Sequence, residues 1–217
     1  MKSPDEDSRR DLWWASRRLA SALALSALAA TPLLAQTTAN PGGGTFTAEA
    51  AATLAAGEPA VEVHIDPAID AARVHAAIDI PQPPDRVWSV MTDCARTLHF
   101  VPGLESCRVV EADPQGRWDV REHKLNWAWF MPNIRTVFRA DYERPRTIKF
   151  RRVAGDLKRS DGEWQLVARD GGRGTRLIYR AIIAADVPAP SFIVVAAMRK
   201  DMTTVLAQLR EECEKNP

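Results

Sequence analysis

Residues 78–93 read IDIPQPPDRVWSVMTD and predict a strand that runs through prolines into a short helix. The prolines open the helix, and its apolar side chains, Val87, Trp88 and Met91, share one face. A long amphipathic pattern from Pro190 to Glu214 predicts a second helix, which closes the chain. A curved sheet with one long helix laid across it readily encloses a hollow, and an apolar hollow binds apolar molecules.

Short β-type runs and turn signals fill the chain between these two segments. The short connections between successive strands predict an antiparallel sheet. At 1.5 Å per residue, the closing helix is about 35 Å long, roughly the span of a ten-residue strand, so it can lie along the whole sheet. The predicted strands cover residues 60–65, 73–80, 105–112, 117–128, 135–143, 147–153, 161–169 and 175–186, and shorter helices are predicted at 48–56, after Pro83 and at 96–101.

The first 35 residues have the pattern of an export signal. Five basic side chains precede an apolar run, and Ala29 and Ala35 offer cleavage points, of which we prefer Ala35. An uncleaved anchor helix is the alternative, but the apolar run is short for a bilayer. Two arginine pairs leave the twin-arginine and the general export routes both open. We therefore expect a signal peptide at 1–35, a flexible linker with a short alanine-rich helix at 36–58, and the folded domain at 60–214 of a periplasmic or secreted protein.

Without residues 1–35, the basic and acidic side chains of the chain balance. A neutral domain lacks the positive field that nucleic-acid binders use, so we expect no nucleic-acid partner. Seven basic side chains nevertheless gather between Arg144 and Arg159, where they alternate with apolar residues. This alternation predicts the solvated face of a strand. The alternative is a patch that binds anionic lipid or protein.

The chain has three cysteines, Cys94, Cys107 and Cys213. No Cys-x-x-Cys and no paired-histidine spacing occurs, so we predict neither a metal site nor a cofactor. In an oxidising compartment, a bond between Cys94 and Cys107 would close a short loop and contribute about 3 kcal/mol. Two buried free thiols are the alternative, and the sequence leaves both open.

Several segments taken together carry a resemblance to a known family. They are residues 80–93, the run GEWQL at 162–166, the run GTRLIY at 174–179, and the closing helix. They resemble the START-like, or helix-grip, superfamily (SRPBCC), and most of all its polyketide cyclase/dehydrase and coenzyme Q-binding branch. The resemblance covers about residues 60–214. The export signal departs from it, because such a signal is less natural for a cytosolic biosynthetic cyclase.

The resemblance implies an α+β fold. In it, a curved seven- or eight-stranded antiparallel sheet wraps around a long C-terminal helix, with two short helices after the first core strand. It also implies a hydrophobic tunnel between sheet and helix. Members of the superfamily bind lipids, isoprenoid quinones, sterols or polyketides, and a minority catalyse cyclisation.

Strand alternation and the apolar stripe of the closing helix select candidates for the wall of such a cavity. His123 and Arg152 are polar residues on otherwise apolar strand faces, so we expect them to meet the polar end of a ligand. The alternative is that the large rings fill a packed core, with a satisfied histidine and a solvated arginine. The candidates are His123, Trp127, Trp129, Phe138, Phe150, Arg152, Trp164, Tyr179, Met198 and Met202.

We predict no catalytic residue. The serines lack a Gly-x-Ser-x-Gly context, and Glu122 and His123 are neighbours on one strand, so they point to opposite faces and cannot act as one pair. We therefore expect an exported protein that binds or carries a lipid, isoprenoid quinone or polyketide-like molecule, with transient contact to a membrane surface. A cyclase-type enzyme that uses Glu122, His123 or Asp201 is the first alternative. A module that binds anionic lipid or protein through the basic strand is the second.

Overall fold

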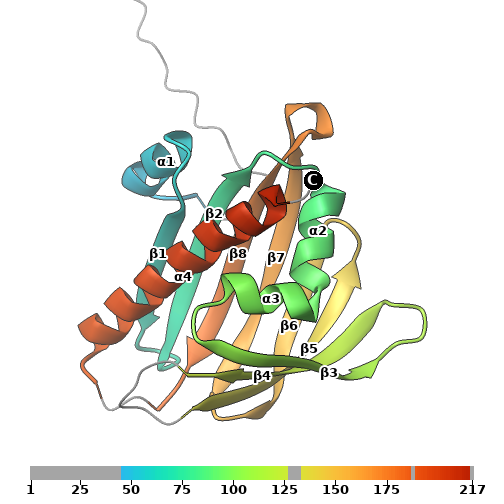
Figure 1. Cartoon of the computed structure of the whole chain (residues 1–217). Helices are drawn as coiled ribbons and strands as arrows, with labels where there is room; N and C mark the ends of the chain where they lie inside the picture. The colour runs from blue at the N-terminus through green and yellow to red at the C-terminus, as the bar shows by residue number, and fades with distance from the viewer. Residues whose placement is uncertain (1–44, 127–132, 187–188, 216–217) are drawn as a thin grey trace, which may run out of the picture. The chain divides into compact units, whose positions relative to one another are not determined.

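Eight antiparallel strands form one sheet in the order β1-β2-β8-β7-β6-β5-β4-β3 (Figure 1). The computed structural model describes residues 45–126, 133–186 and 189–215. The chain divides into two units, 1–38 and 39–217, and the first lies outside the described residues. The strands are β1 (Ala60–Asp66), β2 (Ala71–Ile80), β3 (Leu104–Ala112), β4 (Trp118–Leu125), β5 (Ile134–Glu143), β6 (Thr147–Gly155), β7 (Arg159–Arg169) and β8 (Gly174–Ala184).

In the described residues, four α-helices accompany the sheet, and the predicted helix-grip fold is confirmed. They are α1 (Ala48–Ala55), α2 (Pro84–Thr92), α3 (Cys94–Phe100) and α4 (Ser191–Glu214). Pro84 begins α2, and Asp93 caps α3 by accepting hydrogen bonds from the backbone amides of Ala95 and Arg96. The strand predicted at 60–65 forms as β1 and pairs with β2 at one edge of the sheet.

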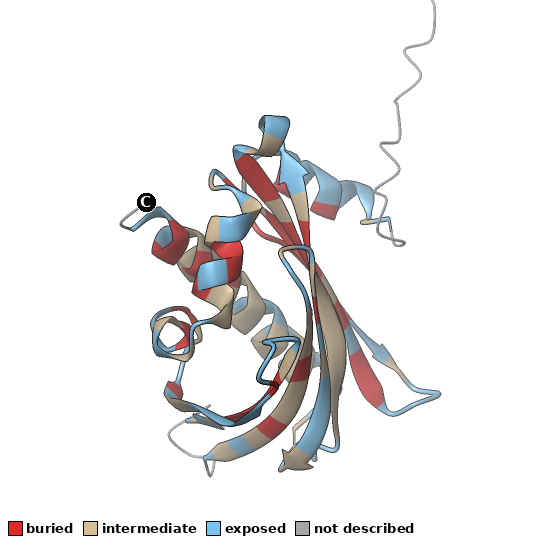
Figure 2. Ribbon diagram, turned by 90° about the vertical axis from the view of Figure 1, so that its right-hand side faces the viewer, coloured by how far each residue is buried: buried red, intermediate tan, exposed pale blue. Residues whose placement is uncertain are grey.

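The main core lies between α4 and the face of the sheet that it crosses (Figure 2). Ile78 on β2 and Leu177 on β8 are directly opposite each other and belong to the same buried cluster as Leu206 and Leu209 of α4. These four side chains are fully buried. Such burial contributes about 1.5–3 kcal/mol for each side chain, so this cluster holds the C-terminal half of α4 on the sheet.

Helix α1 packs on the opposite face of the sheet. Ala50 and Leu54 of α1 are buried with Ala77 and Ile178, which alternate along β2 and β8 with the residues that face α4. Phe46 extends this contact by stacking on His75, with 3.9 Å between the ring centroids. The predicted alanine-rich helix therefore forms and is packed on the sheet.

Polar contacts fix the C-terminal end of α4 to the two short helices. Arg86 of α2 donates hydrogen bonds to the backbone carbonyl oxygens of Cys213, at 3.1 Å, and Lys215. The buried carboxylate of Glu212 lies 3.5 Å from the Arg96 guanidinium and 3.4 Å from the His99 ring. Burial alone would raise the pKa of Glu212, but hydrogen bonds from His99 and Lys215 outweigh it and lower that pKa.

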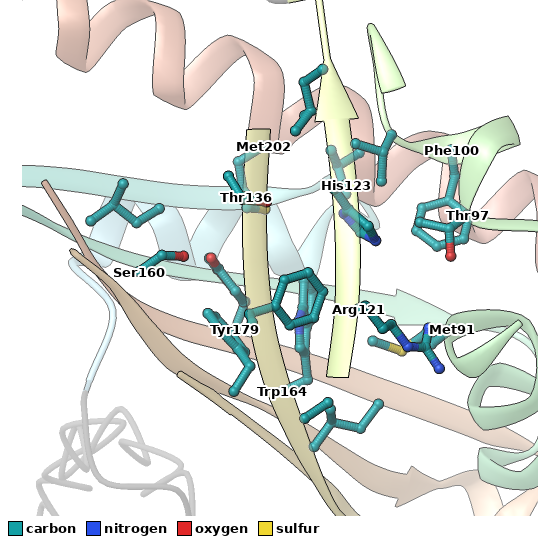
Figure 3. Close-up of a pocket in the computed structure, with 18 of the residues that line it drawn as sticks. Met91, Thr97, Phe100, Arg121, His123, Thr136, Ser160, Trp164, Tyr179 and Met202 are labelled. Atoms are coloured by element: carbon teal, nitrogen blue, oxygen red, sulfur yellow. The ribbon is translucent and has the colours of Figure 1, made fainter. Parts of the chain in front are cut away.

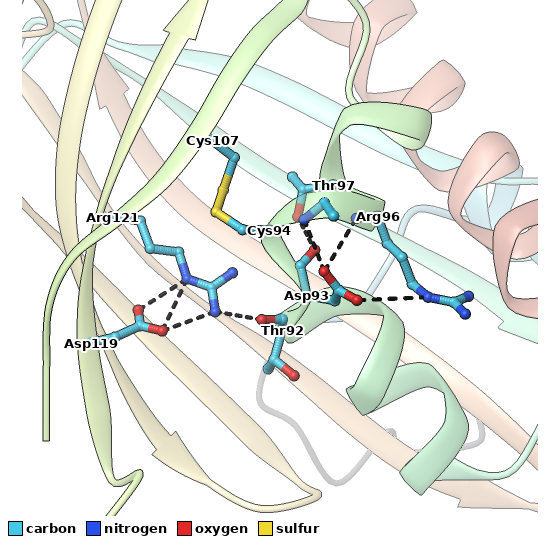
Figure 4. The surroundings of a disulfide bond; sticks show 9 residues. Thr92, Asp93, Cys94, Arg96, Thr97, Cys107, Asp119 and Arg121 are labelled. Carbon is cyan, nitrogen blue, oxygen red and sulfur yellow. Dashed lines mark hydrogen bonds and ion pairs between the residues drawn. A yellow bond between two sulfur atoms is a disulfide. The ribbon is translucent and has the colours of Figure 1, made fainter. Parts of the chain in front are cut away.

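A disulfide joins α3 to β3 through Cys94 and Cys107, whose Cα atoms are 5.4 Å apart (Figure 4). The sequence had left this bond open. Helix α3 is thus held covalently to the sheet on one side and by the ion pairs of Glu212 to α4 on the other. The position of α3 matters because two of its side chains, Thr97 and Phe100, form part of the wall of a cavity.

Candidate functional site

A cavity of about 380 Å³ lies between the sheet and helices α2, α3 and α4 (Figure 3). This volume is in the range of small-molecule sites. Strands β4 to β8 supply most of the wall, α2 and α3 close one end, and α4 lies across it. The lining residues include Met91, Thr97, Phe100, Arg121, His123, Leu125, Ile134, Thr136, Phe138, Ala140, Tyr142, Ile148, Phe150, Ser160, Trp164, Tyr179, Ile183, Met198, Asp201, Met202, Val205 and Leu209.

A continuous series of aromatic rings forms the floor of the cavity. Phe150 stacks on Tyr179 with the ring planes 8° apart, and Trp164 lies 4.2 Å from Tyr179, centroid to centroid. Phe138 meets both Phe150 and His123 edge to face. Aromatic pairs in these geometries contribute about 0.5–1.5 kcal/mol beyond the area they bury, so the floor is fixed before any ligand arrives.

Gly162 on β7 makes room for this ring series. It is directly opposite Phe150 on β6 and Ala181 on β8. A Cβ atom at this position would lie 2.8 Å from Cζ of Phe150 and would also collide with the carbonyl oxygen of Arg180. A side chain at residue 162 would therefore displace the Phe150 ring or the backbone of β8.

Seven of the ten predicted wall residues line the cavity in the structure. They are His123, Phe138, Phe150, Trp164, Tyr179, Met198 and Met202. Trp127 and Trp129 lie outside the described residues. The alternation of inward and outward side chains on five strands, together with the apolar stripe of α4, is the physical reason that the sequence located this set.

Arg152 was also predicted to line the cavity, and it does not. Its side chain is exposed, and its guanidinium donates a hydrogen bond to the carbonyl oxygen of Gly155 at 2.7 Å. Arg152 pairs with Phe138, but the next pair is Ala154 with Val137, so Val153 is an extra residue in β6. This bulge interrupts the alternation at Arg152, and the nearby Gly155 carbonyl fixes its head group in solvent.

The sequence missed a buried ion pair at the cavity wall. Arg121 Nε lies 3.0 Å from Oδ1 of Asp119, and its Nη2 lies 2.9 Å from Oδ2 (Figure 4). The same Nη2 donates to the carbonyl oxygen of Thr92 at 2.6 Å and so ties β4 to the end of α2. Only 7% and 10% of the two side chains are exposed. The alternation that selects His123 also places Asp119 and Arg121 on this face, which is the signal that could have found them.

His123 is a neutral group in this wall. Burial, aided by the nearby charge of Arg121, lowers the pKa of the imidazole to about 4. Its Nε2 is buried and has no hydrogen-bond partner among the described residues. An unsatisfied buried nitrogen of this kind costs about 1–3 kcal/mol until a partner reaches it.

Glu122 points to the other face of the sheet, as its place next to His123 predicts. Its carboxylate accepts hydrogen bonds from Arg108 at 2.9 Å and from Arg135 at 2.6 Å. The contact with Arg135 is the main cause that lowers the pKa of Glu122. Glu122 is therefore part of an outer ion-pair network, whereas Asp201 of α4 lines the cavity with His123.

The basic residues between Arg144 and Arg159 lie on the outer surface, in line with the predicted solvated strand face. Lys149 and Arg151 alternate along β6 with the cavity residues Ile148 and Phe150. Several are paired with acids, which argues against one concentrated positive patch. The ion pairs are Arg144–Asp85 at 3.7 Å, Lys149–Glu143 at 3.0 Å, Arg159–Asp161 at 2.9 Å and Lys158–Asp186.

The described ranges hold neither a cluster of metal ligands nor a helix that could span a membrane. No group of three or more histidine, cysteine, aspartate or glutamate side chains there is arranged to hold a metal ion. In the same part of the chain, no helix combines the length and the apolar character needed to cross a membrane.

The sequence matches the model of one protein family, polyketide cyclase / dehydrase and lipid transport, over residues 80–210. This match covers more than half of the chain, so the protein belongs to that family. Among curated proteins, none matches the sequence.

Solved structures of several proteins share the fold. A STAR-related lipid transfer protein from Xanthomonas axonopodis is 16% identical, with a TM-score of 0.63 over 72% of this chain and 94% of that one. The Zhui aromatase/cyclase from a Streptomyces species is 17% identical, with a TM-score of 0.56 over 66% and 93%. The lipid transfer and protein localization domain of human StarD13 is 14% identical, with a TM-score of 0.61 over 73% and 85%. At these identities the similarity shows the fold, and the cavity chemistry has to be argued from this chain.

Proposed function

We propose that the protein binds and carries a hydrophobic small molecule in the cavity between the sheet and α4. The observation that carries this proposal is a hollow of about 380 Å³ walled mainly by aromatic, aliphatic and methionine side chains. A packed core would have filled this volume, because protein interiors leave few voids larger than a water molecule. The lipid transfer proteins and the aromatase/cyclase with this fold support a ligand that is lipid-like or polyketide-like.

The size and polarity of the cavity limit the ligand. Burial of about 400 Å² of hydrocarbon would contribute about 10 kcal/mol before the costs of association. The volume of about 380 Å³ is near the lower end of the range of small-molecule sites, about 300–1,000 Å³. That space suits one acyl or prenyl chain, or one compact ring system. The tail of a long isoprenoid quinone would exceed this volume.

We further propose that the protein is exported and works in the periplasm or outside the cell. The pattern of residues 1–35 supports this, and so does the Cys94–Cys107 disulfide, because such bonds persist mainly in oxidising compartments. The mass of the protein recovered from the cell envelope tests the proposal. Loss of residues 1–35 is expected, and an intact N-terminus in a cytosolic fraction would contradict it.

A contact with a membrane would let such a carrier load and unload. The first turn of α4 presents Phe192 and Ile193 with 71% and 48% of their surfaces exposed. Arg199 and Lys200 follow on the same helix and are also exposed, so this end combines apolar and basic groups. Amphipathic helix ends of this kind favour anionic bilayers. We propose this end of α4, instead of the basic strand β6, as the membrane-facing surface.

A cyclase-type enzyme is the second candidate function. It is favoured by three ionisable side chains in the wall of the same cavity, Arg121, His123 and Asp201. Incubation with a linear polyketide precursor distinguishes the candidates. A cyclised product whose formation is lost in His123→Leu supports the enzyme, whereas return of the unchanged precursor supports the carrier.

Native mass spectrometry of the purified protein tests the carrier directly. We expect a co-purified hydrophobic molecule, or uptake of an added one. Trp164→Arg should abolish uptake because it places a charged side chain on the aromatic floor. Val153→Arg is the matched control, because it adds the same side chain at an exposed position on β6. Equal uptake by both variants would refute the proposal that the ligand binds in this cavity.

A further inference from the structure

We infer that the cavity selects uncharged ligands and rejects carboxylates. This inference rests on the proposed function, and it concerns the net charge that a ligand head group meets inside. The described wall contains one lysine or arginine side chain, Arg121. Whether that guanidinium can receive an anion decides which head groups can enter.

The charge of Arg121 is already matched. Asp119 accepts three hydrogen bonds from this guanidinium, at 2.9 to 3.1 Å, and the carbonyl oxygen of Thr92 accepts a further one at 2.6 Å. Both charged side chains are nearly fully buried, so water screens their attraction little. A carboxylate that entered would compete with Asp119 for the same donors and would lie close to a second negative charge.

The other ionisable groups of the wall do not attract an anion either. His123 is neutral above its lowered pKa of about 4, and burial raises the pKa of the Tyr142 phenol. Asp201 adds an acidic side chain on α4. A carboxylate would therefore give up its water without meeting an unpaired positive charge, which is strongly unfavourable.

A neutral hydroxyl or carbonyl meets suitable partners in the same wall. Nε2 of His123 has no hydrogen-bond partner in the described part of the chain, and the χ2 torsion of histidine is soft, so a modest ring rotation turns a nitrogen toward the cavity. The hydroxyl groups of Thr97, Thr136 and Ser160 also belong to the wall. Thr97 already donates its hydroxyl hydrogen to the carbonyl oxygen of Asp93, so it can only accept from a head group. Thr136 and Ser160 can donate to or accept from a neutral head group. The ligand class is thus an alcohol, ketone, quinone or similar uncharged molecule with one chain or ring system.

Two ligands with the same chain and different heads test this inference. Dodecan-1-ol and dodecanoate are titrated against the neutral probe N-phenyl-1-naphthylamine, which becomes fluorescent in apolar cavities. At pH 8 we expect dodecan-1-ol to displace the probe at a concentration at least tenfold lower than dodecanoate requires. Between pH 8 and pH 5 the affinity of the alcohol should not change. The affinity of the acid should rise, because its carboxyl group, with a pKa of about 4 to 5, takes up a proton.

A charge variant provides the reverse test. Asp119→Asn keeps the shape of the side chain and leaves Arg121 without its counter-charge. We expect it to bind dodecanoate at least tenfold more tightly than the wild type at pH 8, with less than threefold change for the alcohol. Asp141→Asn is the matched control, because Asp141 also pairs with an arginine, Arg139, at 2.8 Å, and Arg139, unlike Arg121, does not line the cavity.

The outcomes separate this inference from the function on which it rests. If dodecanoate displaces the probe as well as the alcohol does at pH 8, charge selection is refuted and the carrier proposal stands. If the probe, the alcohol and the acid all fail to bind, charge selection and the carrier proposal are both refuted. Should Asp119→Asn fail to fold, the pH dependence of the wild type decides, since an acid that gains nothing between pH 8 and pH 5 overturns the inference.

Discussion

Replacing Cys94 and Cys107 by serine removes the covalent link between α3 and β3. The two residues are 13 positions apart, and closing a loop of that length restricts the unfolded chain by about 3 kcal/mol in the loop-entropy model. We therefore expect the free energy of unfolding to fall by about 3 kcal/mol. For a domain of this size the melting temperature should drop by about 6 to 12 °C.

The same substitution should weaken ligand binding, because α3 carries Thr97 and Phe100 in the cavity wall. Urea unfolding followed by tryptophan fluorescence measures the stability, and titration with N-phenyl-1-naphthylamine measures the binding. The reduced wild type is the control, and it should match the double variant in both assays. A loss of stability below 1 kcal/mol, or unchanged probe affinity, would refute the view that the disulfide positions this wall.

Three further predictions concern single side chains. Gly162→Ala should lower the free energy of unfolding in urea by about 1–3 kcal/mol, because its new methyl group would press on Phe150, and an unchanged midpoint would contradict this. His123 has a folded pKa of about 4, below its unfolded value, so the unfolded chain binds the extra proton first and the protein should lose stability as the pH falls from about 6.5 to 4. His123→Leu should flatten that dependence in pH-resolved thermal melts, and a profile unchanged from the wild type would exclude His123 as its source. Phe192→Ser should reduce co-sedimentation with anionic vesicles severalfold while Val153→Ser leaves it unchanged, and equal loss in both variants would place the membrane contact elsewhere.

Strand alternation made much of the cavity predictable from the sequence. Phe138, Phe150, Trp164 and Tyr179 lie on different strands, yet each could be placed on the inner face from its neighbours two residues away. The fold followed from the order of the strands, the short helices after Ile80 and the long final helix. These features are local, so the sequence carries them directly.

Other parts of the site depend on contacts between distant segments. The prediction that Arg152 lines the cavity was wrong, because a bulge in β6 breaks the alternation, and that bulge depends on the pairing with β5. Thr97 and Phe100 were missed because the packing of α3 against β3 and α4 decides which of its sides faces the cavity. The empty volume is also a tertiary property, since alternation selects inward side chains equally well for a filled core and for a hollow one.

The protonation states of the wall favour binding over acid–base catalysis. A general base works best with a pKa near the operating pH, whereas His123 has a pKa of about 4 and would be a weak base at neutral pH. The guanidinium of Arg121 is engaged by Asp119 and by the carbonyl oxygen of Thr92, so stabilising a developing anion would require breaking a buried ion pair. The same two facts suit a carrier, because a wall with a weak base and an already engaged guanidinium holds an uncharged ligand without reacting with it. Cyclisation by this cavity would require a ligand that raises the pKa of His123 toward 7, and NMR titration of the imidazole with and without ligand would detect that change.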